Sequence, residues 1–94
     1  MNERNADAVA VVIQGLQELG YDCASAPEDL PVAPDFVVRE RRAAFFVSRS
    51  VQESSLNSLE RMGWIIVRIT AEDLRRPRIL FERLDIELSG EDIA

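Results

Sequence analysis

The side chains that could carry out chemistry in this chain are mostly carboxylates. The 94 residues include 17 acidic side chains and 11 arginines, with no lysine and no histidine. Arginine stays protonated at working pH, so the usual groups for proton transfer near neutrality are missing. Tyr21 and Cys23 are the other titratable side chains. Catalysis by a metal ion held on carboxylates is the chemistry that this composition leaves open.

Length and composition predict one soluble, globular domain over residues 1–94. The chain is 47% hydrophobic, which is enough for a single core. No apolar run approaches the ~20 residues that a membrane span needs. Glu3 and Asp7 near the N-terminus are unlike a secretory signal, so we expect a cytoplasmic protein. The core should run over about 5–88, with a frayed acidic tail at 89–94.

The single cysteine, Cys23, can form neither an internal disulfide nor a zinc site. We interpret it as a small, partly buried packing residue beside Tyr21. The net charge of −6 repels nucleic acid at a distance, although a local basic patch can overcome such a field.

The first half of the chain begins with a helix signal. Apolar residues at three- and four-residue spacing predict a helix over 5–20, with Asn5 as its N-cap and Gly20 as its stop. A short strand is expected at 21–25. The loop at 26–34 follows, because three prolines in nine residues deny it regular structure.

A β-hairpin is expected next. The segments 35–39 and 42–49 are apolar and flank the charged turn at 39–42, which predicts an antiparallel pair. The second segment is apolar on both faces, so it should be a central strand covered on both sides. The segment 64–70 is rich in β-branched residues and predicts another strand.

Two further helices are signalled by their caps. Ser50 and Glu53 match the S-x-x-E capping box and should begin a helix that ends at Gly63. Thr70 is expected to cap another helical turn, and Pro77 suits the first position of the C-terminal helix. The expected order is therefore α-β-β-β-α-β-α, with a mixed sheet between layers of helices.

Three passages together resemble the restriction-endonuclease-like, or PD-(D/E)xK, fold. They are PDFVV from Pro34, the strand RAAFFV, and SLERMGWIIVRITAEDL, in which a helix ends at glycine and a strand carries Arg68. The nearest branch is that of the very-short-patch-repair endonucleases, and the match covers about Leu16 to Leu74. The resemblance implies an α/β fold with a three-layer α-β-α core. It also implies a hairpin aspartate that binds Mg²⁺, a second carboxylate on the next strand, and a lysine or other base that activates water.

The second hairpin strand departs from this pattern. Asp35 matches the first position, but Phe46 or Ser48 stands where the second carboxylate belongs, and Ser48 where the lysine belongs. The resemblance thus implies a degenerate active site with no cofactor. Asp35 is then a strand-start residue that accepts local backbone hydrogen bonds, or else a remnant metal ligand.

Several charged side chains are candidates for binding. Arg68 lies mid-strand and needs a partner, so we expect it to pair with Asp35 or another acid, or to reach a phosphate. Two arginine clusters could meet phosphates, although a solvated surface is the favoured interpretation: Arg39, Arg41 and Arg42 at the hairpin, and Arg75, Arg76 and Arg78 near Pro77. Acidic residues that could face a basic partner gather near the C-terminus: Glu82, Asp85, Glu87, Glu91 and Asp92.

These features lead to three hypotheses. The favoured one is a catalytically inactive endonuclease-like domain that binds a protein partner which handles nucleic acid. One concrete version is an inhibitor of restriction or of a CRISPR effector. The second is a divergent Mg²⁺-dependent DNA nuclease, with Asp35 joined by Glu18 or Glu40 as metal ligands. The third is a structural homodimer that pairs through the strand edge at 21–25.

Overall fold

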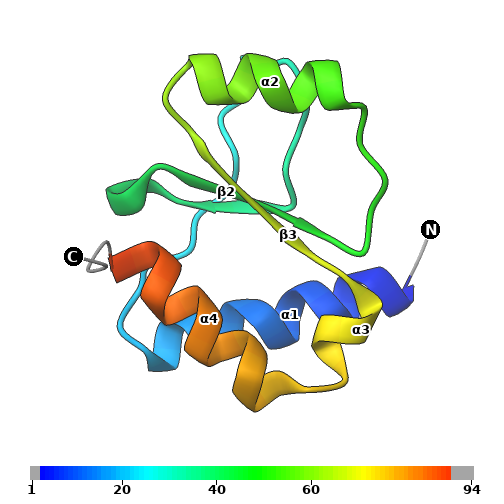
Figure 1. Ribbon diagram of the computed structural model, residues 1–94, viewed down its shortest axis with the longest axis vertical. Coiled ribbons are helices and arrows are strands. Elements are labelled where there is room, and N and C mark those ends of the chain that lie inside the picture. The colour runs from blue at the N-terminus through cyan, green and yellow to red at the C-terminus, as the bar shows by residue number, and fades with distance from the viewer. Residues whose placement is uncertain (1–2, 90–94) are drawn as a thin grey trace.

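The computed structural model describes residues 3–89 of the chain. Its elements are α1 (Glu3–Glu18), β1 (Phe36–Val38), a 3₁₀ turn η1 (Arg39–Arg41), β2 (Ala43–Val47), α2 (Glu53–Arg61), β3 (Ile65–Ile69), α3 (Ala71–Leu74) and α4 (Pro77–Ser89) (Figure 1). The expected mixed α/β class is confirmed. None of the helices within this range is both long and apolar enough to cross a membrane.

The sheet has the order β1-β2-β3. β1 and β2 form the expected antiparallel hairpin, with Phe36 opposite Phe45. β3 runs parallel to β2, and this register places Arg68 beside Phe46. All five residues of β2 are buried. The prediction of a central strand is confirmed, because its two apolar faces both need cover.

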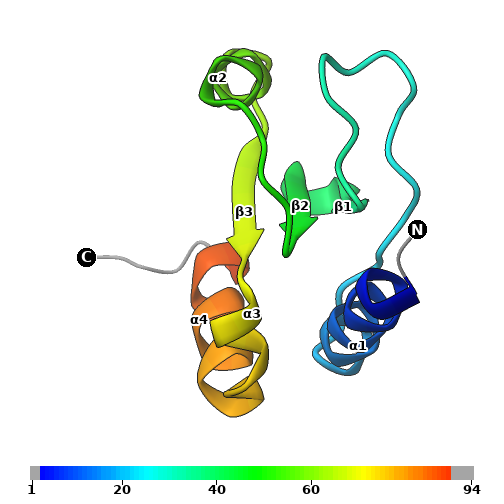
Figure 2. The ribbon, with the colours of Figure 1, turned by 90° about the vertical axis from the view of Figure 1, so that its right-hand side faces the viewer.

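Helices lie on both faces of the sheet. Figure 2 shows α2 on one side and α1, α3 and α4 on the other. The α1/α4 side holds the larger apolar cluster, which includes Leu16, Phe45 and Leu84. The α2 side holds a second cluster around Phe46 and Leu59, to which the 26–34 loop adds partly buried side chains. The sheet therefore has a separate core on each face.

The glycine stops are confirmed. α1 ends at Glu18 and α2 at Arg61. Gly20 and Gly63 follow with φ of +100° and +96°, in the left-handed region that glycine enters at little cost. The prediction of Asn5 as an N-cap was wrong, because the helix already begins at Glu3. Glutamate and arginine are good helix formers and extend the first turn upstream of Asn5.

The two predicted helix caps had different outcomes. Thr70 and Asp73 form a complete box at the start of α3, and Pro77 is the first residue of α4, as expected. The Ser50–Glu53 box was wrong. α2 begins only at Glu53, and no side chain caps it. Val51 instead packs into the cluster on the α2 side, which keeps the segment before the helix extended.

The predicted strand at 21–25 was also wrong. It is reduced to one antiparallel bridge between Ala24 and Val37, whose two backbone hydrogen bonds measure 2.8 and 2.9 Å. The prolines that follow prevent a longer ladder. At the other end, α4 includes Ser89, and residues 90–94 of the expected tail, with Glu91 and Asp92, lie outside the described residues.

Candidate functional site

Asp35 lies at the start of β1 and joins the two strands of the hairpin. Its backbone N–H donates to the carbonyl oxygen of Phe45 at 2.8 Å. Its Oδ2 accepts the backbone N–H of Val47 at 2.8 Å. Its side chain is only 14% exposed. The carboxylate thus has a structural role at the start of a strand, but its backbone donor lies on the partner strand, 12 residues away, and is not the local donor that the sequence predicted.

Arg49 forms an ion pair with the other oxygen of the Asp35 carboxylate. Its Nη1 lies 3.4 Å from Asp35 Oδ1 and donates to the carbonyl oxygen of Ala33 at 2.8 Å. The guanidinium lies over the ring of Phe46, 5.5 Å from its centre. These three contacts hold the arginine in one place and leave Nε and Nη2 unused among the described residues.

The expected pair between Arg68 and Asp35 was wrong, because Arg49 takes that position. Arg68 is exposed on β3, and its guanidinium makes no ion pair or hydrogen bond within residues 3–89. It faces a pocket of about 240 Å³ at the carboxyl ends of β2 and β3. The pocket joins two arginines with hydroxyl side chains over an aromatic ring: Arg49, Arg68, Ser48, Ser50, Thr70 and Phe46.

The side chains around Asp35 do not form a site that suits Mg²⁺. Among residues 3–89, no three His, Cys, Asp or Glu side chains form a group that could hold a metal ion. Glu40 is on η1, at the opposite end of the hairpin from Asp35, about 10 Å of strand away. Glu18 is exposed on the last turn of α1. A cation at Asp35 would also lie beside the fixed positive charge of Arg49.

Cys23 and Tyr21 both have a raised pKa, so both are protonated near neutral pH. Burial raises the pKa of Cys23, and nearby Asp22 raises it further. Burial also raises the pKa of Tyr21, whose hydroxyl donates to Asp85 Oδ1 at 3.0 Å. A nucleophilic thiolate needs the opposite shift. Neither group is prepared for nucleophilic or base chemistry at pH 7.

The hairpin arginines have different surroundings. Arg42 has a positive φ of 51°, donates from Nη2 to the carbonyl oxygen of Met62 at 2.7 Å, and lies 4.8 Å from the centre of the Trp64 ring. It therefore binds the carbonyls at the end of α2, where a cation is favoured. Arg39 and Arg41 are exposed at the turn.

The arginines around Pro77 are exposed as well. Arg75 approaches Glu72 at 3.8 Å, and both side chains are exposed. Such a pair contributes little to stability. Arg76 and Arg78 are also exposed. This group is separate from the Arg49–Arg68 pocket and shares no lining residue with it.

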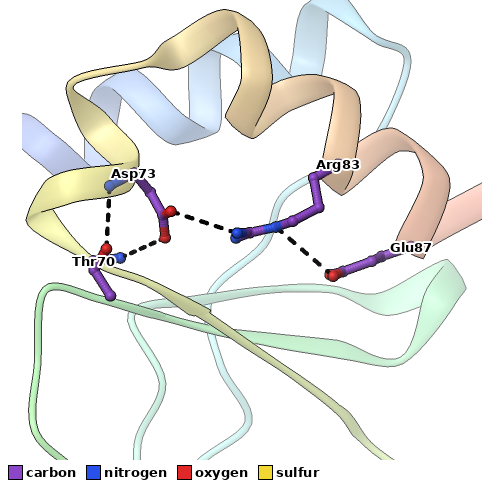
Figure 3. A network of polar contacts seen from close by, with 4 residues as sticks. All are labelled: Thr70, Asp73, Arg83 and Glu87. Carbon is purple, nitrogen blue, oxygen red and sulfur yellow. Dashed lines mark hydrogen bonds and ion pairs between the residues drawn. The ribbon is translucent and has the colours of Figure 1, made fainter.

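The acidic side chains of α4 have different neighbours, although Glu82 and Asp85 line one pocket. Asp85 binds Tyr21, and Glu82 is exposed. Glu87 lies 3.8 Å from Arg83, which also approaches Asp73 at 3.4 Å (Figure 3). The backbone N–H of Thr70 donates to Asp73 and lowers its pKa, and Arg83 lowers it further.

Sequence reasoning missed Arg49 and Arg83. Arg83 could have been found in part, because Glu87 lies four residues further along one helix. Arg49 gave no local signal, since its partner is 14 residues away and is brought near only by the hairpin register.

Comparison with known proteins identifies no relative. No family model, no curated protein and no solved structure matches this chain.

Proposed function

We propose that this chain is a catalytically inactive domain of the restriction-endonuclease-like type, with a three-layer α-β-α core, that acts by binding a protein partner. The observation that carries the proposal is Arg49. Its guanidinium is bound to Asp35, the carboxylate that would hold the metal ion in an active relative. A fixed cation at this position replaces the ion without supplying a Lewis acid or a metal-bound water.

The same arrangement supports a binding role. Arg49 and Arg68 line one pocket, and the nearby Asp35 is already paired with Arg49. Arginine is the side chain best suited to hold carboxylate or phosphate through several hydrogen bonds. The net charge of −6 disfavours nucleic acid as the direct ligand. The partner is a protein that handles nucleic acid, and inhibition of a restriction or CRISPR-type defence system is one concrete form.

Metal binding and plasmid cleavage test the first half of the proposal. Mg²⁺ and Mn²⁺ are titrated by calorimetry into the wild type, Asp35→Ala and Arg49→Ala, with cleavage assays on the same samples. Arg78→Ala serves as an exposed arginine control. We expect no cleavage from any of them. Cleavage by the wild type that disappears in Asp35→Ala would replace this proposal with a metal-dependent nuclease.

Reconstitution tests the second half. A partner captured from the host is purified and mixed with the chain, and a stable complex is expected in size-exclusion chromatography. The nuclease activity of that partner is then measured with and without the chain. Failure to obtain any purified protein that forms a complex would count against a binding function.

A further inference from the structure

Among the residues that the structure describes, β3 has an open edge. In the parallel pair with β2, Ile65 donates its N–H to the carbonyl just before β2, and the carbonyl of Ile69 accepts the N–H just after β2. Alternate residues of a strand direct their backbone groups to opposite edges. The backbone N–H and C=O groups of residues 65, 67 and 69 therefore point toward β2. Those of Ile66 and Arg68 point away from β2, to the open edge.

The open stretch is short and well defined. The N–H of Trp64 is bonded to the end of α2, and the N–H of Thr70 is bonded within its own capping box. Between them, the N–H and C=O groups of Ile66 and Arg68 have no partner within residues 3–89. Sheet order agrees, because β2 is the sole neighbour of β3 in that range. Such an edge is a template for another extended chain.

Side chains along this edge specify what would pair with it. Ile65 is 44% exposed although it is a large apolar residue. Ile66 is half-buried on the opposite face, in contact with the α2-side cluster. Arg68 follows on that same face with its guanidinium unpaired and directed to the pocket that it shares with Arg49. A complementary strand would place apolar side chains near the isoleucines and an acidic one near Arg68.

The helices around β3 favour a single extended segment over a second copy of the domain. Figure 2 shows α2 and α4 on opposite sides of β3. Strands in one sheet lie about 4.8 Å apart, whereas packed helices need about 8–10 Å between their axes. A sheet continued into a second copy would also have to fit a second α2 and α4 beside the first pair. A lone strand brings no helices with it.

We propose that the protein partner contributes an extended segment that pairs as a fourth strand with β3. This inference rests on the proposed binding function and names its surface. The segment hydrogen-bonds to the backbone of Ile66 and Arg68, and its acidic side chain binds Arg68 beside Arg49. Main-chain hydrogen bonds supply affinity in this mode, and alternate side chains supply specificity.

A displayed library of random peptides about ten residues long, the upper length of a typical strand, is the probe. We expect the wild type to enrich sequences in which two adjacent apolar residues, paired with Ile65 and Ile66, are followed or preceded by an acidic residue two positions from the nearer one, paired with Arg68. Ile66→Pro removes an outward N–H but no hydrogen bond to β2, and it should weaken binding of the selected peptide roughly tenfold or more. Arg68→Glu should also weaken binding, whereas Arg78→Glu, at an exposed arginine outside the pocket, should not.

Three results would overturn the proposal. One is a library without enrichment, and another is a selected peptide that binds a folded Ile66→Pro variant as well as the wild type. If Ile66→Pro does not fold, hydrogen exchange of the wild type decides, because a bound strand must protect the amides of Ile66 and Arg68. The third is a dimer in light scattering that Ile66→Pro disrupts, which would assign the edge to a second copy.

The outcome is separable from the proposed function. A reconstituted partner complex that forms equally with Ile66→Pro overturns the surface while leaving the binding role intact. Metal-dependent cleavage that requires Asp35 would overturn the proposed function, whether or not a peptide pairs with β3.

Discussion

At the scale of single residues, Asp35 joins the start of β1 to the end of β2. Its two oxygens accept the N–H of Val47 and contact Arg49. The same residue type at the same position could serve a metal ion. The difference is made by its neighbours, because one oxygen of this partly buried carboxylate accepts a backbone N–H and the other contacts a guanidinium, whose positive charge repels a second cation.

Replacing Asp35 should therefore cost stability. We expect Asp35→Ala to lower the free energy of unfolding by about 1–3 kcal/mol, because the N–H of Val47 loses its acceptor. Asp35→Asn keeps an acceptor oxygen and should lose less. Urea unfolding of both variants measures the difference. An alanine variant as stable as the wild type would show that this carboxylate has no structural role.

At the scale of elements, Gly15 sets the contact between α1 and α4. A Cβ atom built on Gly15 would lie 2.2 Å from Cζ of Phe81, so the two helices approach at a residue without a side chain. Gly15 weakens the helix by itself, by about 1 kcal/mol relative to alanine. Its presence is explained by the ring of Phe81, which packs against the helix backbone there.

Gly15→Ala tests this contact. Despite the better helix propensity of alanine, we expect it to lower the free energy of unfolding by about 1–3 kcal/mol, because the ring must move. Combining it with Phe81→Ala should remove the clash, so that the two effects are not additive. Thermal and urea unfolding give all four values of the cycle. Additive effects would contradict direct contact.

Thr70 and Ser50 have similar sequence signals for a helix cap, but only Thr70 forms one, which allows a matched comparison. Thr70→Ala should cost about 0.5–2 kcal/mol of stability, because its hydroxyl accepts the N–H of Asp73 at 3.1 Å. Ser50→Ala should change stability little, because Ser50 caps no helix in the structure. Urea midpoints of both variants measure this difference. Equal losses would contradict the assigned start of α2.

Asp73 predicts a pH dependence. Its folded pKa is lowered, first by the N–H of Thr70 and also by Arg83, relative to about 3.9 in an unfolded chain. A depressed carboxylate pKa adds stability above the unfolded value, and this is lost as pH falls through the folded value. The stability difference between wild type and Asp73→Asn should therefore be larger at about pH 6 than at about pH 3. A constant difference in urea unfolding would rule this out.

At the scale of the whole molecule, charge and topology act together. The chain carries a net charge of −6, yet the Arg49–Arg68 pocket gathers positive charge at one end of the sheet. The net charge of the molecule is therefore negative, whereas the side chains that line this pocket carry positive charge. A ligand has to reach the pocket as part of a surface that tolerates the overall negative charge, which suits a basic or neutral protein bearing one local acidic segment.

The same balance predicts weak binding to nucleic acid. We expect no retention of duplex DNA at about 0.15 M salt, because an acidic protein releases few counterions on binding. A gel-shift titration across salt concentrations measures this, with Arg68→Glu as the variant that should change nothing. A complex that weakens steeply with salt and disappears in Arg68→Glu would establish a phosphate-binding surface.

Local pattern was sufficient for much of the fold. The hairpin, the doubly buried β2, the glycine stops and the Thr70 cap each depend on residues within a few positions of one another. Ser50 shows the limit of this approach. Its sequence matches a cap as well as Thr70 does, but Val51 packs into the core, and burial of an apolar side chain outweighs one exposed hydrogen bond.

The sequence by itself determined the mixed α/β class, the central strand and the absence of lysine and histidine, because these follow from residue types and periodicity. Only the tertiary structure decided that Arg49, and not Arg68, pairs with Asp35. It also decided that the 21–25 segment forms only one bridge, to Val37, and that the outward backbone groups of β3 have no partner within residues 3–89. Both outcomes depend on which segments are brought side by side, and strand register between distant segments is not encoded in the local pattern that predicts each strand.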